Sequence, residues 1–131
     1  MGAVRYLLDT CTFLWLCADP ARLSTGARAA LAAPEADLLL SDVTVLEITL
    51  KWAAGKIRLP EPPRSWIERQ SAIWRARAVP LSRAIIYRSS ELPRLHADPF
   101  DRLLLASALE QEAILVSPDD ALRRYPVACL W

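Results

Sequence analysis

The chain has 131 residues, 53% of them hydrophobic, and a formal net charge of +1. This composition excludes a disordered chain, and the length fits one ordinary domain, so we expect a single domain over residues 1–131. The near-neutral charge excludes the overall basic excess of many nucleic-acid-binding proteins, so any basic surface must be local.

The first third of the chain alternates between short apolar runs and helix-forming stretches. Residues 4–8 form an apolar run that ends at Asp9, and we interpret them as a buried strand. A short helix over 12–18 follows, and a helix over 24–33 begins with a capping serine. The next apolar run, 37–41, predicts a second strand.

The middle of the chain is mostly helical. One helix is predicted over 44–55, with Gly55 at the position after its C-cap. Another is predicted over 63–77, where a proline fits the first turn. A weak strand at 78–81 leads into a helix over 82–92.

The last third repeats the alternation, with a helix over 99–112, a strand over 113–117, a short helix over 118–125 and a strand over 127–131. Alternating strands and helices predict right-handed βαβ units. The expected fold is α/β, with a mainly parallel central sheet and helices on both faces. In such sheets, functional sites form at the carboxyl ends of the strands.

Several acids lie near these strand ends, and each has a structural interpretation. Asp9 fits a helix cap after the first strand. Asp119 fits a helix start in Ser117-Pro118-Asp119-Asp120. Glu47 is spaced to pair with Lys51 one helical turn later, although its two sequence neighbours are apolar.

The stretch HADPFDRLLLASAL, residues 96–109, contains two further acids. Asp98 fits a helix cap, and Asp101 falls where a capping-box acid would lie. Asp101 also shares a helix face with Leu105 and Ala108, which are apolar, so it is expected to face inward. His96 lies in a polar loop, and we leave it out of the chemistry, with a contact to a phosphate left open.

Together, the acids indicate a metal site formed by Asp9, Glu47, Asp101 and Asp119. Each lies past a strand end or near a helix start, so all four could meet at one sheet edge. Clustered carboxylates need a compensating cation. Oxygen ligands without a Cys/His cluster predict Mg²⁺ or Mn²⁺ rather than Zn²⁺. Such an ion supports displacement at phosphorus, because it polarises the phosphate and lowers the pKa of a bound water.

The cellular location is predicted from what the sequence lacks. Three cysteines show no metal-type spacing, and no long apolar segment resembles a secretion signal, which predicts a reducing cytoplasm. The apolar runs are only a few residues long, so we expect no membrane span.

Four segments, in this order, resemble the PIN-domain ribonucleases, specifically the VapC-type toxins of bacterial toxin–antitoxin pairs. They are YLLDTCTFLWL (6–16), LLLSDVTVLEITLKWAAGKIRLP (38–60), HADPFDRLLLASAL (96–109) and ILVSPDDALRRYPVACLW (114–131). The resemblance implies a three-layer α/β/α sandwich and Mg²⁺-dependent endoribonuclease activity. It also implies an antitoxin partner that blocks the site, an RNA substrate and a homodimer.

The resemblance also implies roles for individual residues. Asp9 and Asp101 would bind the metal directly. Glu47 and Asp119 would complete the site directly or through water, with Asp120 as the alternative fourth acid. The neighbouring residues have lesser roles: Asp98 as a cap or water-mediated contact, Thr10 and Ser41 as rim hydroxyls, Ser117 as a retained hydroxyl, and Arg102 as a phosphate contact or a solvent-facing side chain. Cys11 has no required role.

Two alternatives remain open. One is a catalytically silent PIN-like module that binds RNA or a protein, against which the presence of all four acids counts. The other is a receiver-type α/β domain, which would need an acid directly beside Asp9 and a lysine after a late strand. The sequence contains neither.

Overall fold

The computed structural model describes residues 3–131 and contains one five-stranded sheet in the order β3-β2-β1-β4-β5. All four strand pairings are parallel, as the alternating pattern predicts. The strands are β1 (Val4–Leu8), β2 (Ala36–Ser41), β3 (Arg77–Val79), β4 (Ile114–Val116) and β5 (Cys129–Leu130).

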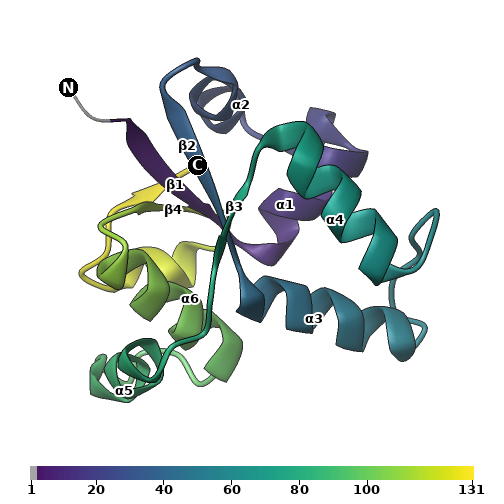
Figure 1. Cartoon of the computed structure of the whole chain (residues 1–131). Coiled ribbons are helices and arrows are strands. Elements are labelled where there is room, and N and C mark those ends of the chain that lie inside the picture. Colours follow the sequence, from purple (N-terminus) through teal and green to yellow (C-terminus); the bar gives the residue numbers. More distant parts are fainter. Residues whose placement is uncertain (1–2) are drawn as a thin grey trace.

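Helices cover both faces of this sheet (Figure 1). The α-helices are α1 (Thr10–Ala18), α2 (Thr25–Ala32), α3 (Asp42–Ala53), α4 (Pro63–Trp74), α5 (Arg83–Glu91) and α6 (Pro99–Glu110). Two short 3₁₀ helices, η1 (Pro20–Arg22) and η2 (Asp120–Arg124), complete the list. Helices α5 and α6 lie on one side of the sheet, and α1 and α4 on the other, so the three-layer α/β/α prediction is confirmed.

Two hydrophobic cores flank the sheet, because successive strand residues point to opposite faces. Leu7, Leu39 and Leu115 pack in the core that contains α5 and α6 residues. Neighbouring strand residues such as Leu8 and Val116 pack in the second core, which contains residues of α1, α2 and α4. Burial on both faces explains why the strands are continuous apolar runs rather than alternating ones.

The predicted elements all occur, but several boundaries differ. Helix α4 ends at Trp74 rather than at residue 77, because Arg75 adopts a left-handed conformation with φ 52° that turns the chain into β3. Helix α3 begins at Asp42, two residues before the predicted start, because Ser41 caps it. The predicted helix at 118–125 is the 3₁₀ helix η2. Among residues 3–131, no helix is both long and apolar enough to cross a membrane.

The parallel register aligns the carboxyl ends of the central strands. Leu8 of β1 is paired with Val116 of β4, and the Asp9 amide donates to the Val116 carbonyl at 3.2 Å. Asp9 therefore leaves the sheet beside Ser117, the residue after β4. Ser41, the last residue of β2, lies at the same edge.

Candidate functional site

The four predicted acids line one pocket at this sheet edge. Its volume is about 260 Å³. The residues that line it are Asp9, Thr10, Cys11, Glu47, Lys51, Asp98, Asp101, Pro118 and Asp119. Segments far apart in the sequence thus bring five carboxylates and one lysine into a single cavity.

Asp9 performs the structural role and faces the pocket at the same time. It is buried, and its Oδ1 accepts from the Thr12 amide at 2.8 Å, which caps α1. The Thr12 hydroxyl donates to the Val116 carbonyl at 2.9 Å and so holds the start of α1 against β4. The cap interpretation and the site interpretation of Asp9 are therefore compatible, because the cap uses only one carboxylate oxygen.

Glu47 is held through both of its carboxylate oxygens. The Thr10 hydroxyl donates to Oε1, and the Lys51 ammonium lies 3.1 Å from Oε2. The pair with Lys51 predicted from the helical spacing is present, and both residues line the acidic pocket. Lys51 thereby supplies a positive charge inside the pocket, which the sequence interpretation missed because it treated the pair as a surface feature.

At the start of α6, Asp98 and Asp101 have different roles. Asp98 Oδ1 accepts from the Phe100 amide at 2.9 Å and caps the helix, as predicted. Asp101 Oδ2 lies 2.7 Å from His96 Nε2. His96, Asp98 and Asp101 each offer one ligand atom, and these atoms lie within 4.8 Å of one another.

His96 therefore contacts an acid of the site, a contact that the sequence analysis does not predict. The sequence does contain an indication, because His96 lies two residues before the Asp98 cap and Asp101 lies three residues after it. Residues just before a cap often pack against the first helical turn, most typically the residue directly before the cap. A polar loop by itself does not show this direction.

The structure distinguishes Asp119 from Asp120 as the candidate for the fourth acid. Asp119 lines the pocket, its Oδ1 accepts from the Ala121 amide at 2.9 Å, and its own amide donates to the Ser117 hydroxyl at 3.1 Å. The Asp120 side chain is 92% exposed, lies 3.7 Å from Arg123 and does not line the pocket. Geometry therefore favours Asp119 as the fourth acid.

Two of the secondary residues differ from expectation. Ser41 is buried and its hydroxyl accepts from the Val43 amide at 3.0 Å, so it is a cap of α3 rather than a rim hydroxyl. Arg102 does not face solvent, so that alternative is wrong. Its guanidinium is occupied by contacts within the protein and is not free to bind a phosphate. It donates to the carbonyls of Ser89, Leu92, Pro93 and His96 and to the Tyr125 hydroxyl.

Burial and mutual repulsion raise the pKa of two of these acids. The pKa of Asp9 is raised above its ordinary 3.8, mainly by burial and slightly by Glu47, against hydrogen bonds with Ser117 and Thr12. The pKa of Asp101 is raised by burial, against the hydrogen bond with His96, and further by Asp98 and Asp119. Burial and the Asp9 charge also raise the pKa of the Cys11 thiol, which keeps it protonated.

The donor set fits a hard divalent cation. Carboxylate oxygens dominate the pocket, and a positive ion would offset the repulsion that raises the Asp9 and Asp101 pKa values. Oxygen-rich donor sets suit Mg²⁺ and Mn²⁺, and the single imidazole nearby is tolerated better by Mn²⁺.

The raised pKa of Asp9 predicts how metal-free stability depends on pH. Between 3.8 and the raised folded pKa, the folded protein binds more protons than the unfolded chain. The Asp9 contribution to the unfolding free energy therefore falls as pH rises through that window. In urea denaturation with EDTA, the stability of Asp9→Asn relative to the wild type should increase as the pH rises above about 4. A difference independent of pH would contradict this expectation.

Comparisons with known proteins show which family and which folds this chain resembles. The family model described as PIN domain matches residues 6–128. A relative named Ribonuclease VapC22, from Mycobacterium tuberculosis (strain ATCC 25618 / H37Rv), is 29% identical over 120 residues, which are 91% of this chain and 90% of the relative.

Solved structures share the fold at low sequence identity. VapBC2 from Rickettsia felis, bound to a DNA fragment from its promoter, matches with a TM-score of 0.73 at 18% identity, over 98% of this chain and 99% of that chain. FitAcB from Neisseria gonorrhoeae matches with a TM-score of 0.66 at 18% identity, over 96% of each chain. DNA-bound VapBC from Salmonella typhimurium gives 0.66 at 16%, with 97% of each covered.

Proposed function

The chain belongs to the PIN domain family, and from that premise we propose that it is a metal-dependent endoribonuclease that acts as the toxin of a toxin–antitoxin pair. In this proposal residues 1–131 form one PIN domain. The substrate is RNA, and the reaction is hydrolysis of its phosphodiester bonds.

The observation that carries this proposal is the convergence of Asp9, Glu47, Asp101 and Asp119 on one pocket. A silent binding module has no need to hold four carboxylates together, because burial and mutual repulsion make their charged forms unfavourable. Such a cost is typical of a site that binds a cation for catalysis.

In the proposed site, Asp9 and Asp101 would bind Mg²⁺ or Mn²⁺ directly, and Glu47 and Asp119 would do so directly or through water. When bound, the ion would polarise the phosphate and lower the pKa of the attacking water. Glu47 or Asp119 would accept the proton of that water. The Thr10 hydroxyl fixes the orientation of Glu47 for this role.

Neighbouring side chains would hold these acids in place. His96 Nε2 fixes one oxygen of Asp101, and the Ser117 hydroxyl fixes the backbone of Asp119. Lys51 holds the second oxygen of Glu47. Because these contacts exist without the ion, little side-chain ordering is needed when it binds.

We propose the partners of this chain from the complexes in which similar proteins occur. The solved structures that share this fold include VapBC2, VapBC and a toxin–antitoxin complex from Klebsiella pneumoniae, which supports a cognate antitoxin for this chain. We further propose a homodimer and a cytoplasmic location, where an RNA substrate and an antitoxin would be available.

The direct test is cleavage of RNA by the purified protein. We expect cleavage with Mg²⁺ or Mn²⁺, none in EDTA, and recovery when the metal is returned in excess. Induction of the wild-type gene should arrest growth, whereas Asp9→Asn should not. RNA cleavage or growth arrest that survives Asp9→Asn would overturn the metal mechanism, and a wild-type protein that cleaves no RNA would favour the silent module.

A further inference from the structure

The acidic pocket presents a charge problem for an RNA substrate. Five carboxylates and one lysine line it, so a single divalent ion leaves the pocket negatively charged. The substrate carries a negative charge on every phosphate. Productive binding therefore requires positive side chains close to the pocket, on the path that the strand follows.

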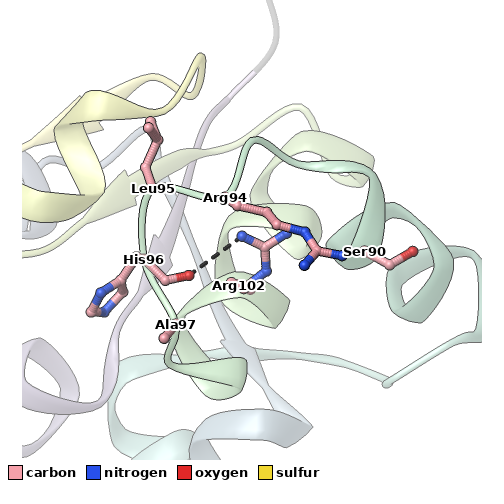
Figure 2. A pocket seen from close by; sticks show the side chains of 6 residues that line it. All are labelled: Ser90, Arg94, Leu95, His96, Ala97 and Arg102. Atoms are coloured by element: carbon pink, nitrogen blue, oxygen red, sulfur yellow. Dashed lines mark hydrogen bonds between the residues drawn. The ribbon is translucent and has the colours of Figure 1, made fainter.

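A second cavity, the loop pocket, is formed by the loop before α6 together with residues of α5 and α6, and it has the opposite charge character. Its volume is about 510 Å³. It is lined by Ser90, Arg94, Leu95, His96, Ala97 and Arg102 (Figure 2). None of these residues is acidic. His96 connects the two pockets indirectly, because it lines the loop pocket and its Nε2 contacts Asp101, which lines the acidic pocket.

The two arginines of the loop pocket differ in their availability. The Arg102 guanidinium donates hydrogen bonds to carbonyl oxygens of α5 and of the following loop, and Figure 2 shows its bond to the His96 carbonyl. Arg94 is exposed and forms no hydrogen bond or ion pair with another residue in the range 3–131. In Figure 2 its side chain extends across the pocket toward Ser90, past the Arg102 guanidinium.

Two guanidinium groups in one cavity without a carboxylate repel each other, and an anion would relieve this repulsion. Arginine binds phosphate oxygens through two parallel N–H donors. Because Arg102 is committed to the backbone, Arg94 is the group that can turn toward a phosphate. The position of the cavity next to Asp101 indicates which phosphate this would be.

We propose that the loop pocket binds a backbone phosphate of single-stranded RNA that flanks the bond being cut, with Arg94 as the contacting residue. This inference rests on the proposed function and specifies how its substrate is placed. A flexible single strand that passes His96 would extend from the acidic pocket to the loop pocket. Arg94 is thus a residue for substrate positioning, remote from the water and the reacting phosphorus.

The test compares Arg94→Ala with Arg83→Ala, using the full chain with Mg²⁺ and a short single-stranded RNA. Arg83 is also exposed and begins α5, but it does not line the loop pocket. We expect Arg94→Ala to raise KM about tenfold and to leave kcat nearly unchanged, as for a contact made equally in the ground and transition states. Arg83→Ala should match the wild type, and Arg94→Lys should restore part of the affinity, because an ammonium keeps the charge but not the two parallel donors.

The dependence of KM on salt concentration gives a second test of the phosphate contact. Loss of one phosphate contact to a single strand should reduce the slope of log KM against log salt by about 0.7. If the wild type cleaves RNA and Arg94→Ala behaves like Arg83→Ala in KM and in slope, the loop-pocket inference is wrong and the proposed function stands. A fall in kcat alone would also overturn the inference. A wild type that cleaves no RNA would overturn the proposed function itself.

Discussion

Replacing Asp101 with Asn should lower the rate of metal-dependent RNA cleavage by about 10²- to 10³-fold, the effect of losing one preorganised electrostatic group. Asn keeps the size of the side chain and an oxygen that can accept from His96, so the fold should be retained. What disappears is a negative charge at the position where the metal is proposed to bind. The variant is assayed at a Mg²⁺ concentration that saturates the wild type and then at higher concentrations. Cleavage that recovers with more Mg²⁺ indicates weaker metal binding, and cleavage that stays low indicates a lower kcat.

The same variant should be more stable than the wild type when no metal is present. Burial and neighbouring carboxylates raise the pKa of Asp101, so its charged form destabilises the folded protein at neutral pH, and Asn removes that charge. Added Mg²⁺ should stabilise the wild type more than the variant, because a ligand that binds only the folded state shifts unfolding. Asp120→Asn is the matched control, and it should leave cleavage and thermal unfolding near wild type because the Asp120 side chain is 92% exposed. Equal losses in the two variants would contradict this assignment.

Replacing Arg102 with Ala should destabilise the protein by about 2 to 3 kcal/mol, a typical cost for losing hydrogen bonds to a charged group. Few other side chains could replace this guanidinium. It donates to the Ser89 and Leu92 carbonyls at 2.7 and 2.9 Å and to the Pro93 carbonyl at 2.9 Å. It therefore joins the end of α5 to the loop that carries His96. Without it, the loop should lose its fixed position against Asp101, and cleavage should fall as well.

Chemical denaturation and amide exchange over residues 93–98 would measure these effects. Arg102→Lys should recover little stability, because an ammonium lacks the planar fork that reaches several carbonyls. Arg88→Ala is the control, since Arg88 forms an exposed pair with Glu110 at 2.9 Å between the same two helices. An exposed pair contributes about 0 to 1 kcal/mol. If Arg102→Ala is no less stable than Arg88→Ala, the loop does not depend on this guanidinium.

The sequence was sufficient to predict the layers of the fold and the convergence of the acids. Strands buried on both faces appear as short apolar runs, and their parallel pairing requires acids such as Asp9 and Asp119 to meet at one edge. The inward direction of Asp101 also followed from helical periodicity. These inferences depend on local patterns and on topology, which a single sequence contains.

Other features depend on contacts that local patterns do not specify. The ring of His96 reaches Asp101 because the loop before α6 folds over the first turn, which the spacing of the two residues permits but does not require. Arg102 reaches carbonyls of α5 through a tertiary contact between helices, so its spacing in the sequence gave no indication. Ser41 fits a cap and a rim hydroxyl equally well from sequence, and only its burial separates the two. The helix over 63–77 was predicted too long because the turn at Arg75 uses a left-handed residue other than glycine.

Asp9, Asp98 and Asp119 each spend one carboxylate oxygen on capping a helix. Asparagine offers the same acceptor and caps helices as well as aspartate does. The codons for these two amino acids differ by a single base. If the proposed metal site is correct, one such mutation at Asp9 would remove the proposed nuclease activity and keep the folded domain. Inactive descendants would then be easy to reach and free to evolve as binding proteins.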